Sequence, residues 1–198
     1  MNLPNKLTVS RMIITPVFMA AMLLSSVPFN YSAALILFVV GSLTDLLDGK
    51  IARKNGIVTN FGKFLDPVAD KMLTTAALLG FMVILPGDGL KLQMTIITFL
   101  TLFREFAVAS VRLIAVSSET KKVIAANIWG KIKTVFQMLS IILGLSAYSV
   151  MEFVPLGEKI FGAVMIVFIL LSWIAAITGV ISGIIYITES RELIDSSK

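Results

Sequence analysis

Apolar residues dominate this chain in long runs that charged residues rarely interrupt. Residues 12–29, 134–151 and 160–188 contain no charged residue at all. A helix that spans a bilayer needs about 20 mostly apolar residues, so each run is long enough or nearly so. The pattern predicts membrane-spanning helices rather than the core of a water-soluble domain.

Three further apolar runs are too short to span a membrane alone. They cover residues 31–44, 72–87 and 92–103, and each meets a charged residue at one end or at both. They reach full length only if their helices continue through charged residues, which are Asp45, Asp48, Asp66, Asp70, Arg104 and Glu105. The pattern therefore predicts charged side chains on helices near one membrane face.

Breaks rich in Pro, Gly, Ser and Asn separate these segments and mark the ends of the helices. The predicted helices cover 8–27, 31–54, 60–85, 91–116, 127–149 and 158–188. The opening residues, 2–11, mix Leu with polar groups, which predicts a short N-terminal surface helix. The expected fold class is all-α and integral to the membrane, with six transmembrane helices. Because no repeat or linker is visible, we expect a single domain over residues 1–198.

Composition supports the membrane class and limits the chemistry. The chain is 57% apolar and 15% charged, with a mean hydropathy of +0.94, whereas a soluble domain has about 25% charged residues. It contains neither Cys nor His. This excludes disulfides, thiolate or imidazole metal sites and His-dependent catalysis. A bound metal must use oxygen ligands, which suits Mg²⁺, Mn²⁺ or Ca²⁺.

The basic residues predict the orientation of the chain. With the N-terminus inside, only Lys91 and Lys159 of the 17 Lys and Arg residues lie near predicted outer ends. Lys and Arg concentrate on the cytoplasmic side of membrane proteins. The charged helix ends should therefore face the cytoplasm from the cell (inner) membrane. The net charge of +5 then meets anionic membrane lipids, and nucleic acid is not an expected partner.

Four aspartates lie close together in the sequence. Asp45 and Asp48 are three residues apart, and Asp66 and Asp70 are four apart, so each pair shares one face of its predicted helix. A short turn joins the two helices, which makes them antiparallel neighbours and lets the pairs converge. Four carboxylates near a bilayer disfavour one another's ionisation. Two divalent cations would balance them and would serve phosphoryl displacement.

Small and basic residues accompany the aspartates. Gly49 and Gly62 each lie four residues from an aspartate, where a missing side chain leaves room for a nucleotide. Ala52 is also small, and Arg53 can bind a phosphate through two hydrogen bonds. The alternative is that the aspartates pair with basic neighbours at a solvated helix end. That alternative does not explain the spacing of all four or the small residues between them.

These residues form one pattern, D-x2-D-G-x2-A-R-x8-G-x3-D-x3-D, which residues 45–70 match at every fixed position. The pattern resembles the CDP-alcohol phosphotransferases. The resemblance implies six transmembrane helices, a homodimer, a cytoplasm-facing site, CMP as leaving group and two Mg²⁺ or Mn²⁺ ions. It implies that the metal ligands are Asp45, Asp48, Asp66 and Asp70. It further implies that Asp70 is the general base and that the CDP site is lined by Gly49, Ala52, Arg53 and Gly62.

Further segments resemble the branch of bacterial phosphatidylglycerophosphate synthases, namely residues 4–11, 64–71, 104–105 with 112, and 130–134. The implied substrates are CDP-diacylglycerol and sn-glycerol 3-phosphate. An acceptor with its own phosphate needs a basic pocket, for which the candidates are Arg104, Arg112, Lys131 and Lys133. Three alternatives stay open. Lys131 could instead meet lipid head groups, Arg104 could pair with Glu105 or cap a helix, and Thr8 contacts either the nucleotide phosphates or the surface.

Two alternative functions also stay open. The same chemistry could use phosphatidylglycerol, serine or inositol phosphate as acceptor. A cation transporter could use the carboxylates as its ion path, although such proteins usually show internal repeats and helices broken at the midplane.

Pro67 lies between two of the aspartates. It predicts either a kink with a freed carbonyl near Lys63 or the true start of the helix.

Overall fold

The computed structural model describes residues 3–55, 60–117 and 127–190. Within these ranges, the side chains of residues 3–5, 45–55, 60–67, 70, 112 and 114–117 lie outside the description. The helices are α1 (Leu3–Leu23), α2 (Asn30–Asn55), α3 (Asn60–Ile84), α4 (Asp88–Ser117), α5 (Ile128–Phe153) and α6 (Glu158–Glu189). These described ranges contain no strand, so the all-α prediction is confirmed.

The N-terminus differs from the prediction. Helix α1 begins at Leu3 and runs to Leu23 as one helix, and the described residues contain no separate surface helix before it. Thr8 and Arg11 are each only 2% exposed, so packing against other helices anchors this opening turn. The structure therefore does not confirm a short N-terminal surface helix.

Four helices of the described chain are long and apolar enough to cross a membrane. The spans are Lys6–Leu23 in α1, Asp88–Val111 in α4, Ile128–Phe153 in α5 and Glu158–Glu189 in α6. Two shorter apolar helical segments are Asn30–Thr44 of α2 and Lys71–Ile84 of α3. Large apolar side chains such as Phe103 and Leu170 are exposed on the outside, as lipid contact requires. The chain is a multi-pass membrane protein.

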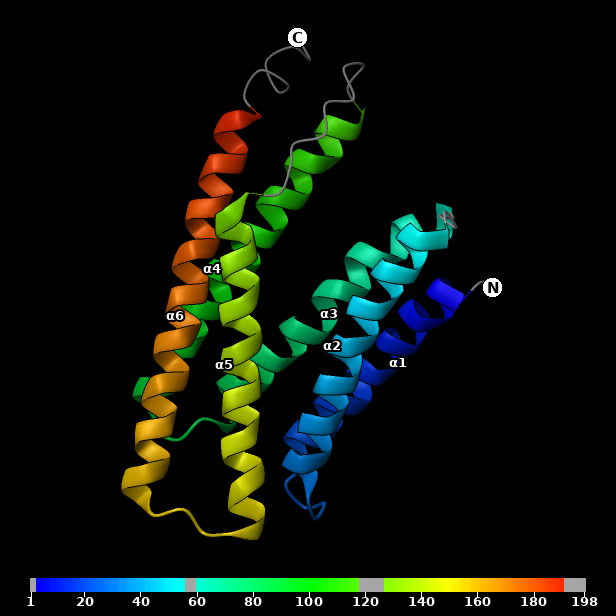
Figure 1. The fold of residues 1–198 in the computed structure, drawn as a ribbon. Coiled ribbons are helices and arrows are strands. Elements are labelled where there is room, and N and C mark those ends of the chain that lie inside the picture. The colour runs from blue at the N-terminus through cyan, green and yellow to red at the C-terminus, as the bar shows by residue number, and fades with distance from the viewer. Residues whose placement is uncertain (1–2, 56–59, 118–126, 191–198) are drawn as a thin grey trace.

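Successive helices run in alternating directions (Figure 1). The start of α1, the end of α2 and the start of α3 lie toward one end of the bundle. The ends of α4 and α6 and the start of α5 lie toward the same end, at the top of the view. Helix α1 packs against α2 and α3, α2 packs against α5, and α6 packs against both α4 and α5. The helix segments with the aspartates and with the predicted basic pocket therefore belong to one end of the molecule.

One hydrophobic core joins all six helices. Its fully buried members include Phe18, Phe38, Phe81, Met94, Leu145 and Phe168. The rings of Phe81 on α3 and Phe168 on α6 lie 4.6 Å apart between centroids. Gly144 of α5 lets that helix approach the pair, because a β-carbon there would lie 2.7 Å from Phe81 Cζ. Such close packing fixes the positions of the helices that carry the charged residues.

At the other end, α5 holds both helices that carry the aspartates. Glu152 accepts hydrogen bonds from the backbone amides of Tyr31 and Ser32, at 2.7 and 3.0 Å, at the N-terminus of α2. These first amides have no partner within their own helix, so a carboxylate stabilises them. Tyr148, one turn earlier on α5, donates a hydrogen bond of 2.9 Å to the carbonyl of Ile84 at the end of α3. Helix α5 thereby sets where α2 begins and where α3 ends.

Candidate active site

The aspartates lie on the helices that the sequence predicts for them. Asp45 and Asp48 are in the second half of α2, and Asp66 and Asp70 are in the first half of α3. Each pair therefore keeps the helical spacing that places both members on one face. The side chains of these four residues and of four of the predicted CDP-site residues lie outside the described residues. The latter are Gly49, Ala52, Arg53 and Gly62. Convergence of the carboxylates stays a prediction.

Pro67 lies inside α3 and not at its start. The helix begins at Asn60, so the interpretation of Pro67 as the start of the helix is wrong. A proline inside a helix lacks the amide that would bond to the carbonyl four residues earlier. A freed carbonyl at Lys63 therefore stays the prediction for this site.

Helix α1 contributes a buried polar face next to the aspartate helices. Thr8, Arg11 and Thr15 are 2%, 2% and 5% exposed, and their spacing of three and four residues places them on one side of the helix. The hydroxyl of Thr15 donates to the carbonyl of Arg11 at 2.9 Å. Because α1 packs against α2 and α3, this face brings a buried guanidinium to the helices that carry the aspartates. The surface alternative for Thr8 is wrong, and its contact with nucleotide phosphates stays a prediction.

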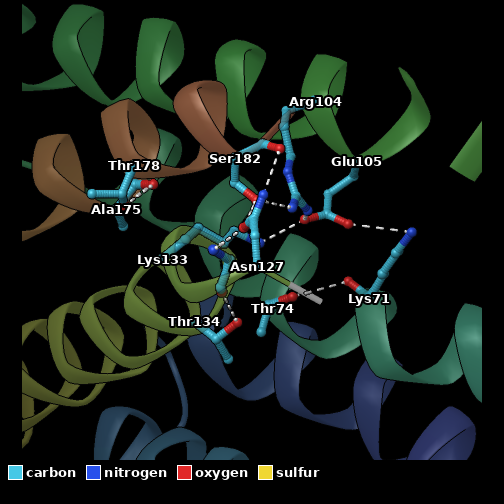
Figure 2. Close-up of polar contacts among 11 residues, drawn as sticks. Lys71, Thr74, Arg104, Glu105, Asn127, Lys133, Thr134, Ala175, Thr178 and Ser182 are labelled. Carbon is cyan, nitrogen blue, oxygen red and sulfur yellow. Dashed lines mark hydrogen bonds and ion pairs between the residues drawn. The ribbon is translucent and has the colours of Figure 1, made fainter. Parts of the chain in front are cut away.

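A basic cluster surrounds Glu105 of α4 (Figure 2). Its Oε1 atom lies 2.9 Å from Nη1 of Arg104 and 2.6 Å from Nζ of Lys133 on α5. Its Oε2 atom lies 3.2 Å from Nζ of Lys71 on α3. Three helices thus place three positive charges around one negative charge, which leaves a net charge of +2. Because a charge at membrane depth is unfavourable by a few kcal/mol, a charged cluster between apolar helices indicates a site.

A second layer of hydrogen bonds fixes Arg104. Its Nη2 atom donates to Oγ of Ser182 on α6 at 3.1 Å, and that hydroxyl donates to Oδ1 of Asn127 at 2.7 Å. Asn127 is the N-cap of α5 and accepts from the amide of Gly130 at 2.9 Å. Its side-chain amide donates a hydrogen bond of 3.2 Å to the backbone carbonyl of Ser182. The start of α5, the end of α6 and the guanidinium of Arg104 are therefore held as one unit.

Two glycines of α6 pack closely against the side chains of Arg104 and Lys133. A β-carbon on Gly183 would lie 3.0 Å from Cγ of Arg104, and one on Gly179 would lie 3.2 Å from Cγ of Lys133. The two glycines are one turn apart on one face of α6. Their missing side chains admit the aliphatic stems of both basic residues.

The structure divides the four basic residues that the sequence predicted for the acceptor pocket. Arg104 and Lys133 meet at Glu105. Lys131 is exposed, and two residues of helix place it about 200° around α5 from Lys133, so it points away from this cluster and its role in an acceptor pocket stays a prediction. Arg112 lies on α4 with its side chain outside the described residues. The alternative that Arg104 pairs with Glu105 is confirmed.

Sequence reasoning assigned no role in the acceptor pocket to four members of the cluster. They are Lys71, Glu105, Asn127 and Ser182. Two of them carried a visible signal. Lys71 follows Asp70 directly, and Glu105 interrupts an apolar run beside Arg104. Nothing in the sequence marks Asn127 or Ser182, because their hydrogen bonds to the cluster depend on which helices lie next to each other.

Lys71 connects the two halves of the site. It is the next residue after Asp70 on α3, and its side chain reaches Glu105 on α4. One residue of helix corresponds to about 1.5 Å along the axis. The backbone of Lys71, one member of the cluster, therefore lies about 1.5 Å along the axis of α3 from that of the predicted general base.

The chain belongs to the CDP-alcohol phosphatidyltransferase family, whose model matches residues 1–188. It is 37% identical to a Bacillus subtilis (strain 168) protein named CDP-diacylglycerol--glycerol-3-phosphate 3-phosphatidyltransferase, over 99% of this chain and 98% of the relative. A Rickettsia felis protein of the same name is 34% identical over 96% of each chain. A Haemophilus influenzae protein of that name is 37% identical over 71% of this chain and 73% of the relative.

Proteins of this family generally depend on a divalent cation. The donor set of this chain fits such an ion. Carboxylates on α2 and α3 are hard oxygen ligands, and the sequence offers neither imidazole nor thiolate to a softer metal. The helical spacing of both pairs agrees with this fit.

Proposed function

We propose that this chain transfers the phosphatidyl group of CDP-diacylglycerol to sn-glycerol 3-phosphate, which yields phosphatidylglycerophosphate and CMP. The observation that carries the proposal is the cluster of Lys71, Arg104 and Lys133 beside the helix position of Asp70. Such a cluster suits an acceptor with its own phosphate, because Arg and Lys bind phosphate through charge-assisted hydrogen bonds. The names of the relatives support the same reaction.

The donor side of the site uses α1, α2 and α3. We propose that two divalent cations, Mg²⁺ or Mn²⁺, are held by Asp45, Asp48, Asp66 and Asp70. When bound, they supply positive charge that stabilises the pyrophosphate and the departing CMP. The proposed CDP-site residues are Thr8, Gly49, Ala52, Arg53 and Gly62. The buried guanidinium of Arg11 adds a fixed positive charge on α1.

The acceptor side uses the basic cluster. In this proposal Lys71, Arg104 and Lys133 bind the phosphate of glycerol 3-phosphate and orient its free hydroxyl toward the donor. Asp70 takes the proton of that hydroxyl while the oxygen attacks the phosphorus of the phosphatidyl group. The bond between that phosphorus and the bridging oxygen of the pyrophosphate breaks, and CMP leaves with the electron pair. Positioning of both substrates supplies much of the acceleration in such displacements.

The proposed topology places this chemistry at the inner membrane surface. We propose that α2 and α3 complete their spans through the aspartates, which gives six transmembrane helices. The basic cluster then lies on the cytoplasmic side of the cell membrane, in agreement with the usual distribution of Lys and Arg. We also propose a homodimer, as the family resemblance implies, and cross-linking in native membranes tests it.

The decisive experiment is product analysis with the full chain purified in detergent micelles. CDP-diacylglycerol and Mg²⁺ are supplied with glycerol 3-phosphate, inositol phosphate, serine or phosphatidylglycerol, one at a time. We expect CMP release and a phosphatidylglycerophosphate mass only with glycerol 3-phosphate. Equal CMP release without glycerol 3-phosphate, or a larger rate with another acceptor, would contradict the proposal.

A further inference from the structure

Glu105 has more ionic partners than a single structural ion pair requires. Both of its carboxylate oxygens are used, Oε1 by Arg104 and Lys133 and Oε2 by Lys71. Its side chain is 15% exposed. One cation would suffice to neutralise one carboxylate. The carboxylate thus gathers three cations from three helices around one point, where a second anion can also contact them.

The summed charge of these four side chains matches that of a phosphate monoester. Such a group carries about −1.5 to −2 charges at pH 7, against the net +2 of the four side chains. Arg104 also retains unused hydrogen-bonding capacity, because its buried Nε atom has no hydrogen-bond partner in the described part of the chain. Both observations indicate an anion with two charges rather than a neutral alcohol.

The three cations differ in how firmly they are held. Arg104 and Lys133 are 15% and 12% exposed in their side chains, and the glycines of α6 lie against their stems. Lys71 is 37% exposed. It is therefore the cation that can most readily turn from Glu105 toward a bound ligand.

We propose that Glu105 is a positioning residue that arranges Lys71, Arg104 and Lys133 to receive the phosphate dianion of the acceptor. This inference rests on the proposed function and deepens it. The carboxylate holds three mutually repelling cations from three helices at fixed places around one point. When the acceptor binds, its phosphate takes Lys71 from Glu105, while Arg104 and Lys133 contact both anions. Glu105 thus makes the pocket selective for a doubly charged acceptor.

The test is steady-state kinetics of the full chain in micelles with Glu105→Gln. Gln keeps the size of the side chain and removes its charge, so the three cations separate. We expect the KM for glycerol 3-phosphate and the Ki of inorganic phosphate to rise together by about tenfold or more. The KM for CDP-diacylglycerol should stay within about twofold of wild type. Glu105→Asp, which keeps the charge, should recover part of the loss.

A matched control and a second variant keep the test decisive. Glu158→Gln makes the same change at an exposed position of α6 and should leave every constant unchanged. If Glu105→Gln does not fold, Lys71→Gln at the more exposed position should still raise the KM and the Ki together. Unchanged or lower values in a folded Glu105→Gln or Lys71→Gln chain would overturn the inference. A wild-type chain that needs no glycerol 3-phosphate would instead overturn the proposed function.

Discussion

Gly183 of α6 lies directly against Arg104 of α4, so closely that a β-carbon would come within 3.0 Å of Arg104 Cγ. A contact this short requires one group to move. The guanidinium of Arg104 is held by Glu105 and Ser182, so the aliphatic stem has little freedom to give way. The glycine is therefore part of what places the guanidinium.

Gly183→Ala should weaken binding of the acceptor without unfolding the chain. The added methyl group displaces Arg104, and overpacking of this kind amounts to about 1–3 kcal/mol. We expect the KM for glycerol 3-phosphate to rise about tenfold, since 1.4 kcal/mol corresponds to that factor. The matched control is Gly162→Ala on the same helix, where a β-carbon meets nothing within 4 Å. Equal kinetics for the two variants would show that the close contact has no consequence.

Lys133→Ala should separate the two basic residues that the sequence could not distinguish. Lys133 contacts Glu105 at 2.6 Å, and its loss removes one of three cations from the proposed phosphate site. We expect about a tenfold rise in the KM for glycerol 3-phosphate, because hydrogen bonds to charged groups are worth about 1.5–3 kcal/mol. Lys131→Ala, at the exposed position two residues earlier, should behave like wild type. CMP release at varied acceptor concentration measures both, and the reverse result would place Lys131 in the pocket.

Asp70→Asn should abolish turnover and leave the fold intact. A general base contributes about 10²–10⁴-fold to a rate, and the amide cannot accept the proton of the acceptor hydroxyl. We expect CMP release to fall by at least about 100-fold, with a thermal unfolding midpoint close to that of wild type. Asp88→Asn, at the exposed start of α4, is the control for the loss of one charge. Wild-type turnover in Asp70→Asn would exclude its role as base.

Glu152→Ala should lower stability and not chemistry. The carboxylate caps α2 through the amides of Tyr31 and Ser32, far from the basic cluster. Its loss leaves these amides without that partner, at about 1–3 kcal/mol. In micelles, we expect the thermal unfolding midpoint to fall by several degrees. At temperatures well below that midpoint, where the variant is folded, the KM for glycerol 3-phosphate should be unchanged. Glu158→Ala, at an exposed position of α6, should change neither value. An unfolding midpoint of Glu152→Ala equal to that of wild type would contradict the stabilising role of this carboxylate at the start of α2.

The helices could be predicted from the sequence because each depends mainly on residues close together in the chain. A long apolar run flanked by turn residues forms a helix in a membrane, where every backbone group must find a partner within the segment. The start of α3 was ambiguous because Pro67 fits both a helix start and a helix interior. The burial of Thr8 and Arg11 on α1 could not be predicted, because both residues are polar and only packing between helices shows that they are buried.

The sequence by itself determined that this chain is a membrane protein of six helices with paired aspartates on two of them, because periodicity and composition are properties of the chain. Only the tertiary structure decided that Lys71, Arg104 and Lys133 meet at Glu105. It also decided that Lys131 does not join them and that two glycines of α6 pack against Arg104 and Lys133. These relationships depend on how each helix is rotated against its neighbours. That rotation follows from side-chain packing between helices distant in sequence.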